Sequence, residues 1–151
     1  MTESESKFTV RPLCLNETEL AAEVERISLG HEAWTADGIR DTLELNGHYF
    51  AAFLSEKFVG HAGFTAVLDD GYITNIAVLP QFRRMGAASM LTAALIEKAK
   101  QLKLSFLTLE VRESNKVAIA LYEKYGFKPA GRRKRFYSEP FEDAIIMTLN
   151  F

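Results

Sequence analysis

The chain has 151 residues, of which 48% are hydrophobic and 25% are charged, and we expect them to form one α/β domain, residues 1–151. A net charge of −2 gives no reason to expect nucleic-acid binding. One cysteine, Cys14, excludes an internal disulfide, and three separated histidines lack metal-ligand spacing, so we expect no metal.

No apolar run reaches the length of a membrane span, and the polar start MTESESK contains no apolar signal core. We therefore expect a cytoplasmic protein without a membrane partner. Residues 1–6 are expected to be frayed, and the oligomeric state is left open.

A first strand is predicted at Phe8–Arg11. Pro12 is expected to end it, because proline has no N–H for the sheet hydrogen bonds. A helix follows, with Asn16 as its N-cap, Glu19 completing a capping box, and Gly30 as its end. Its buried stripe is predicted from helical spacing to be Leu20, Val24 and Ile27.

Thr35 is predicted to cap a second helix that runs through Leu45, with Ile39 and Leu43 facing inward. Trp34 precedes this cap. It fits a hydrophobic staple or core aromatic better than a direct substrate contact, although this corner between two helices could form one wall of an acceptor cleft.

A hairpin is predicted from strands at 49–54 and 58–67, which Ser55-Glu56-Lys57 connects. The turn Asp69-Asp70-Gly71 then leads into a strand at 72–78. These strands should be antiparallel.

The segment that follows, Arg83 to Ser89, is a basic turn with small residues that opens a helix. Free N–H groups and the positive end of the dipole make a helix start suitable for a phosphate. Gly86 and Ala88 leave room for it, and Arg83 and Arg84 add positive charge. On its own, the segment is equally compatible with an ordinary strand–turn–helix corner. The helix itself is predicted from apolar spacing at Ala87, Leu91, Ala94, Leu95, Ala99 and Leu102.

A strand at 105–111 completes a β–α–β unit, so it should be parallel to strand 72–78. Its Glu110 could lie at a water-exposed strand end or in a cleft. The next helix begins near Asn115 and ends at Gly126. Tyr122 is two turns from Asn115 and therefore on the same side, with the small Ala118 between them.

Two final strands, from Phe127 and at 142–149, enclose the basic run Arg132–Arg135. Such a run is usually a solvated face, although an acidic or phosphate-bearing partner would also fit it.

Several segments, in this order and spacing, resemble the GNAT superfamily of N-acetyltransferases, and within it the RimI-type protein N-terminal acetyltransferases. They are Asn75-Ile76-Ala77-Val78, Arg83–Ser89, Leu109-Glu110-Val111-Arg112, Ser114-Asn115, Ala118–Tyr122, Gly126-Phe127 and Glu142–Met147. The N-terminal half matches through ELAAEVERIS and Trp34-Thr35, with Ala33 where the family usually has proline.

The resemblance implies the GNAT acyl-CoA N-acyltransferase fold: a mixed, mostly antiparallel sheet flanked by helices, whose central strands splay apart around the cofactor. It implies Glu110 as the catalytic base and Tyr122 as the acid. It also implies a set of acetyl-CoA-binding residues: Ile76, Ala77, Val78, Arg83, Arg84, Met85, Gly86, Ala87, Ala88, Ser89 and Asn115. From the residues alone, Tyr122 could be a core tyrosine and Asn115 a helix cap.

The implied reaction is acetylation of a protein α-amine, with the N-terminal alanine of a small-subunit ribosomal protein as the implied acceptor. Two alternatives stay open. One is an acetyltransferase for small amines such as polyamines or antibiotics, and the other is a non-catalytic acyl-CoA-binding module.

Overall fold

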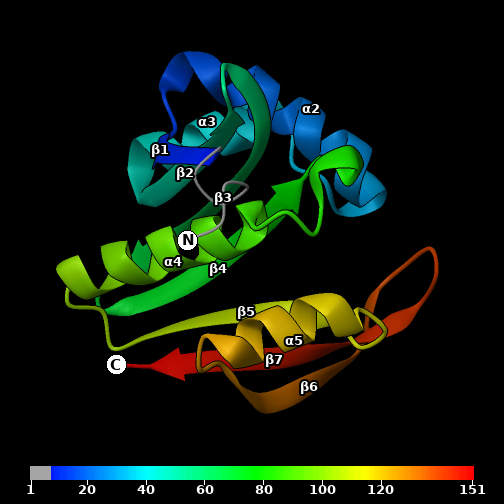
Figure 1. Ribbon diagram of the computed structural model, residues 1–151. Helices are drawn as coiled ribbons and strands as arrows, with labels where there is room; N and C mark the ends of the chain where they lie inside the picture. Colours follow the sequence, from blue (N-terminus) through cyan, green and yellow to red (C-terminus); the bar gives the residue numbers. More distant parts are fainter. Residues whose placement is uncertain (1–7) are drawn as a thin grey trace.

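A single seven-stranded sheet runs through the computed structural model, which describes residues 8–151 (Figure 1). The strand order is β1-β2-β3-β4-β5-β7-β6, and every neighbouring pair is antiparallel except β4 and β5. The strands are β1 (Phe8–Pro12), β2 (Gly47–Leu54), β3 (Lys57–Val67), β4 (Asp70–Val78), β5 (Phe106–Arg112), β6 (Lys128–Tyr137) and β7 (Glu142–Asn150). The predicted mixed, mostly antiparallel sheet is confirmed.

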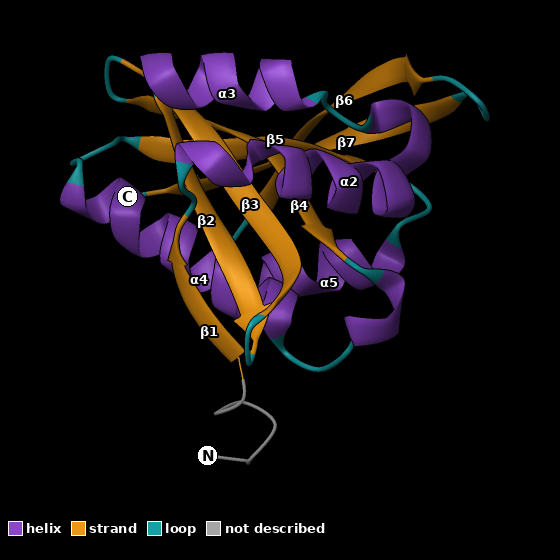
Figure 2. Cartoon of the chain, turned by 90° about the horizontal axis from the view of Figure 1, so that it is seen from above, coloured by secondary structure: helices purple, strands orange, loops and turns teal. Residues whose placement is uncertain are grey.

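Helices cover both faces of the sheet, and each face has its own core (Figure 2). The helices are α2 (Thr18–Leu29), α3 (Ala36–Leu45), α4 (Ala87–Gln101) and α5 (Lys116–Lys124), with short 3-10 turns η1 (Leu15–Glu17), η2 (Gly30–Glu32) and η3 (Pro80–Phe82). Leu91 and Leu95 of α4 and Tyr122 of α5 belong to one core, whereas Val24 of α2 and Ile39 of α3 belong to the other. Among residues 8–151, no helix combines the length and apolar composition needed to cross a bilayer.

The parallel strands β4 and β5 separate along their length. They pair only at Asp70↔Phe106, Gly71↔Leu107 and Tyr72↔Thr108. Beyond this point the two strands diverge, which Figure 1 shows as a widening gap toward the right of the view. The predicted splay of the central strands is therefore confirmed, and β4 has an edge from residue 73 onward that β5 does not cover.

The start and buried face of α2 differ from the prediction. Asn16 lies inside η1 rather than at a helix cap, and Glu17, instead of Glu19, accepts the N–H of Cys14 at 2.9 Å. Leu20 and Ile27 are about half exposed (49% and 47%). The face that is buried carries Thr18, Ala21, Val24 and Glu25. Two of these residues are polar, so a search for apolar periodicity could not find this face.

The other predicted helix ends are confirmed. The Thr35 hydroxyl accepts the N–H of Gly38 at 3.0 Å, which caps α3. Asn115 caps α5, and Gly126, with φ of 96°, follows its end. Gly30, with φ of 59°, ends α2.

Candidate active site

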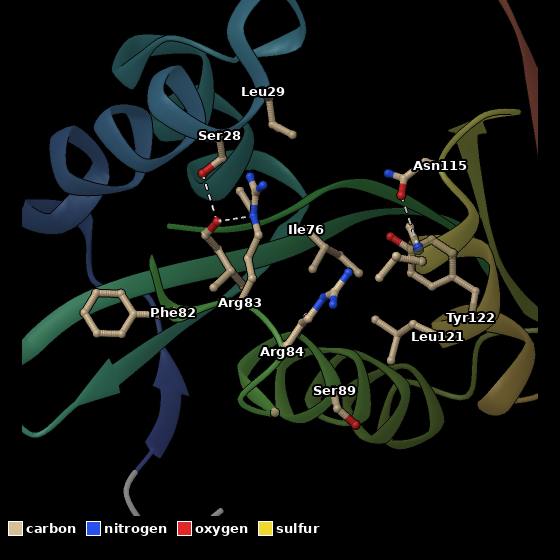
Figure 3. Close-up of a pocket in the computed structure, with 16 residues that line it drawn as sticks. Ser28, Leu29, Ile76, Phe82, Arg83, Arg84, Ser89, Asn115, Leu121 and Tyr122 are labelled. Atoms are coloured by element: carbon tan, nitrogen blue, oxygen red, sulfur yellow. Dashed lines mark hydrogen bonds between the residues drawn. The ribbon is translucent and has the colours of Figure 1, made fainter. Parts of the chain in front are cut away.

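A first cavity of about 690 Å³ lies where β4 leaves β5, between the start of α4 and the start of α5. In Figure 3, Asn115 and Tyr122 lie on one side of it and Ser28 on the other, with Arg83 and Arg84 between them. Its lining includes most of the residues predicted to bind acetyl-CoA: Ile76, Ala77, Val78, Arg83, Arg84, Gly86, Ala88, Ser89 and Asn115. Met85 and Ala87 of that set do not line the cavity, because their side chains pack into the core.

The backbone of β4 presents polar groups to this cavity. Leu79 donates its N–H to Val59 of β3, and N–H directions alternate along a strand, so the backbone groups of Val78 and Ile76 point away from β3. This is the side that β5 leaves open. The Val78 carbonyl there accepts the Ser28 hydroxyl at 3.0 Å and Arg83 Nε at 3.4 Å. The N–H groups on the same side can serve a bound ligand.

The turn before α4 has the geometry of an anion cradle. Arg84 and Gly86 both have positive φ, 62° and 100°, and a Cβ added at Gly86 would meet no atom within 4 Å. The first intrahelical bond of α4 here runs from Met90 N–H to the Gly86 carbonyl, so the N–H groups of the preceding turn have no i−4 partner within the helix. Tyr125, just after α5, donates its hydroxyl to the Ser89 carbonyl at 3.0 Å and so holds the start of α4 against α5.

Asn115 and Tyr122 reach the same cavity, as their spacing predicted. The Asn115 side-chain oxygen accepts the Ala118 N–H at 3.1 Å, so this residue both caps α5 and lines the cavity. Tyr122 is 8% exposed, and burial, followed by the nearby Tyr137, raises its pKa well above the ordinary value. Its phenol is therefore protonated at neutral pH and is able to donate a proton.

A second cavity, of about 520 Å³, opens elsewhere along the β4–β5 divergence and contains Glu110. Asn75 and Ile76 are neighbours on β4, but Asn75 lines the second cavity and Ile76 lines the first. The opening between β4 and β5 therefore lies where the two cavities meet. Trp34 is 37% exposed and lines this second cavity, so it forms a cleft wall instead of a core aromatic. Glu110 thus lies in a cleft, the second of the two positions that its sequence allowed.

Charged groups surround the second cavity. Arg133 of β6 approaches Glu110, with 3.5 Å between Nε and Oε2. Arg112 pairs with Glu32 of η2 at 2.8 Å and with Glu142 at 3.1 Å, and it stacks on the ring of Tyr137. Burial raises the pKa of Tyr137 to about 12, with the negative charge of Glu110 as the next cause. The basic run Arg132–Arg135 of β6 is exposed, as expected for a solvated face, and Arg132 makes surface ion pairs with Glu113 and Asp143.

Sequence reasoning missed most of the second cavity. Besides Glu110 and Trp34, its lining comes from His31, Glu32, Thr65, Tyr72, Ile73, Thr74, Asn75, Phe136, Tyr137 and Ser138. These residues lie on separate segments that only the folded sheet brings together. The one local signal that could have found part of it is the acidic and aromatic corner Glu32–Trp34.

The family model described as "Acetyltransferase (GNAT) family" matches residues 15–127. The chain belongs to this family. A Bacillus subtilis protein with a provisional assignment as a ribosomal protein bS18-alanine N-acetyltransferase is 35% identical, over 94% of this chain and 95% of that protein.

Solved structures agree with this assignment. The crystal structure of the ribosomal-protein-S18-alanine N-acetyltransferase from Escherichia coli has a TM-score of 0.87 at 32% identity, over 95% of this chain and 93% of that one. A GNAT acetyltransferase from Elizabethkingia anophelis, solved with acetyl-CoA bound, shares the fold, with a TM-score of 0.79 at 22% identity, over 96% of this chain and 99% of that one. The protein is thus an N-acetyltransferase of a family that uses acetyl-CoA.

The residues of the first cavity fit such a ligand. The N–H groups of Ile76 and Val78, on the side of β4 that β5 leaves open, suit an extended amide-containing arm, and the positive-φ turn before α4 suits a pyrophosphate. Arg83 and Arg84 add charge complementary to phosphate at the same place.

Proposed function

We propose that this protein transfers the acetyl group of acetyl-CoA to the N-terminal α-amine of a protein that begins with a small residue such as alanine. A small-subunit ribosomal protein is the proposed acceptor. The names of the Bacillus subtilis and Escherichia coli relatives support this choice, since both carry a ribosomal protein alanine as substrate.

One observation carries the proposal. The divergence of β4 and β5 separates two cavities, with the protonated phenol of Tyr122 in one and the carboxylate of Glu110 in the other. Acetyl-CoA is proposed to enter from the first cavity and the acceptor amine from the second. An acid and a base on opposite sides of one opening are what a transfer between two ligands requires.

Bound acetyl-CoA supplies a thioester carbonyl that an amine can attack, forming a C–N bond and breaking the C–S bond. The Val78 N–H is proposed to polarise that carbonyl, and Ile76 to hold the arm beside it. Glu110 takes the proton that the amine loses, directly or through a water, and Tyr122 gives a proton to the leaving sulfur. The protons therefore balance, and later exchange with solvent restores both side chains. Backbone groups of residues 84–89 and Asn115 are proposed to hold the remainder of the ligand.

The chemistry of the acceptor favours an α-amine. Its pKa is ~8, against ~10.4 for a lysine side chain, so its neutral fraction near neutral pH is roughly a hundredfold larger. A carboxylate such as Glu110 therefore suffices as its base. A small first side chain is expected, because the amine has to reach the narrow opening between β4 and β5.

The test is competition between two sets of peptides with acetyl-CoA. One set has a free N-terminal alanine; the other has the same sequence with that terminus blocked and an internal lysine free. We expect kcat/KM for the free-alanine set to be higher by roughly a hundredfold, following the difference in neutral amine. Acetylation of the blocked set at a comparable kcat/KM, with mass spectrometry placing the acetyl on lysine, would overturn the assignment. Spermidine and an aminoglycoside in the same assay test the small-amine alternative.

A further inference from the structure

A buried carboxylate on α2 connects the two walls of the second cavity. Glu25 is 1% exposed. Its Oε1 accepts the backbone N–H of Trp34 at 2.7 Å and the side-chain amide of Asn75 at 2.9 Å. Its Oε2 lies 2.7 Å from Nε2 of His61, which is also fully buried on β3. One side chain therefore contacts the corner before α3, the middle of β4, and β3.

Asn75 stands beside an irregularity in β4. The register between β3 and β4 shifts between Gly63 and Phe64, and this shift leaves Thr74 without a partner in the ladder. The Thr74 hydroxyl donates to the Gly63 carbonyl at 3.1 Å and contacts the Tyr49 hydroxyl at 3.2 Å. At this irregularity the side chain of Thr74 replaces the missing ladder contact, and Glu25 adds a side-chain bond at the neighbouring Asn75.

Both hydrogen-bond donors of Glu25, Trp34 and Asn75, line the second cavity, and neither lines the first. A carboxylate in this position is costly unless its donors remain in place, because a buried charge has to be hydrogen-bonded. Removing it would also leave the Trp34 N–H and the Asn75 amide without this acceptor, which costs more than the loss of an exposed bond. The disturbance should therefore be larger on the side of the second cavity. His61 also loses its contact with Glu25, but it touches the first cavity only through its strand partner Ala77.

We propose that Glu25 is a positioning residue for the acceptor. It fixes the distance between the Trp34 wall and the β4 wall of the second cavity, and so sets the affinity for the incoming amine without touching it. The inference rests on the proposed function for the assignment of this cavity to the acceptor. It predicts a separation of effects: the acceptor KM depends on Glu25, and acetyl-CoA affinity does not.

The test compares Glu25→Ala with Glu25→Gln and with Glu23→Ala. Glu23 lies on the same helix, half exposed and paired with Arg26, so its variant removes a carboxylate of α2 that is remote from the cleft. We expect Glu25→Ala to raise the KM for an alanine-terminal peptide by about tenfold, equivalent to ~1.4 kcal/mol. Glu25→Gln keeps a carbonyl oxygen for Trp34 and Asn75, so it should restore KM to within about threefold. Glu23→Ala should match the wild type.

A second readout needs no acceptor. Trp34 is the single tryptophan of the chain, so its fluorescence reports on this corner alone. Acrylamide quenching should increase in Glu25→Ala and stay at the wild-type level in Glu23→Ala, while the acetyl-CoA Kd of both changes by less than about twofold. If Glu25→Ala does not fold, it is replaced by a double-mutant cycle between Asn75→Ala and Glu25→Leu, since leucine fills the space but removes the acceptor oxygens. Non-additive effects on acceptor KM are expected there, since the two groups share a hydrogen bond.

The outcomes are distinguishable. An active wild type with unchanged acceptor KM in Glu25→Ala overturns the inference alone, as does an equal loss of acceptor and acetyl-CoA affinity or additivity in the cycle. A wild type that acetylates no peptide terminus overturns the proposed function and, with it, this inference.

Discussion

The two cavities are built in different ways. The first comes almost entirely from two short stretches, 76–89 and 115–122, in which backbone geometry and a helix start are proposed to do most of the binding. The second collects side chains from five parts of the chain: the corner at 31–34, Thr65 of β3, residues 72–75 of β4, Glu110 of β5, and residues 136–138 at the end of β6. A site made of local backbone geometry leaves a pattern in the sequence, whereas a site made by sheet topology does not. The difference also fits the proposed ligands. The first cavity, made of local backbone geometry, suits a ligand that is always the same, and the second cavity suits an acceptor that has to be selected.

The largest expected effect is that of removing the proposed general acid of the first cavity, Tyr122. Tyr122→Phe removes one buried hydroxyl from the first cavity and leaves the ring in its contact with Phe127. General acid catalysis contributes roughly 10²–10⁴-fold, so we expect kcat to fall by that factor with acetyl-CoA affinity little changed. Steady-state kinetics and calorimetry measure the two quantities.

Tyr125→Phe is the matched control for kcat, because it removes a nearby hydroxyl that does not line the cavity. Since this hydroxyl holds Ser89, we expect its loss to change acetyl-CoA affinity and to leave kcat unchanged. A kcat for Tyr122→Phe within about threefold of the wild type, well below the range for a general acid, would show that Tyr122 is not the acid.

The next effect concerns the anion cradle. Gly86→Glu places a carboxylate in the proposed pyrophosphate position, and its Cβ would meet no atom within 4 Å. Like-charge repulsion should weaken acetyl-CoA binding by about a hundredfold or more, equivalent to ~2.8 kcal/mol, while the fold survives. Calorimetry with coenzyme A measures this loss.

Gly30→Glu controls for backbone strain in this experiment. Gly30 also has a positive φ and open space around its Cβ, but it does not line the first cavity. Equal affinities for coenzyme A in folded Gly86→Glu and Gly30→Glu would contradict the cradle.

Features built from local sequence could be predicted, whereas features built from contacts between distant segments could not. The parallel pairing of β4 and β5 and the position of Gly86 were predictable, because strand–turn–helix order and glycine placement are local properties. The splay of the two strands was expected only from the family resemblance. The face of α2 was predicted wrongly, since Glu25 is buried there through a contact with His61 of β3 that lies 36 residues away in sequence. The place of Glu110 in a cleft needed the family resemblance, because the residues alone favoured a position at a water-exposed strand end.

A clamp across the second cavity gives a third, smaller effect. Arg112 joins the Glu32 corner to Glu142 and to the carbonyls of Ser138 and Pro140. Arg112→Gln shortens the side chain and removes its charge, so the two walls should separate. We expect acceptor KM to rise by about tenfold, ~1.4 kcal/mol, with acetyl-CoA Kd unchanged. The free energy of unfolding should fall by ~1.5–3 kcal/mol, the range for hydrogen bonds to a charged group.

Arg132→Gln is the control for this clamp, because Arg132 also makes two ion pairs but lies outside both cavities. Its acceptor KM should match the wild type. If acetyl-CoA affinity falls in Arg112→Gln as much as acceptor affinity does, the effect of Arg112 is not confined to the acceptor side of the site.

The smallest expected effect tests whether the basic run Arg132–Arg135 takes part in acceptor binding. Arg133 is the member of the run that approaches Glu110, but its side chain is 57% exposed and the closest N–O distance is 3.5 Å. An exposed pair of this kind contributes ~0–1 kcal/mol, so Arg133→Gln should change kcat/KM by less than about fivefold. Salt screening should remove even this change, because the pair faces solvent. The measurement is kcat/KM for one alanine-terminal peptide at low and high ionic strength, with Lys134→Gln removing the same charge from the next residue of β6. A loss of roughly a hundredfold that persists at high salt would exceed any exposed ion pair. Arg133 would then have to bind the acceptor directly, and the acceptor site would extend along β6 from Phe136 to Arg133.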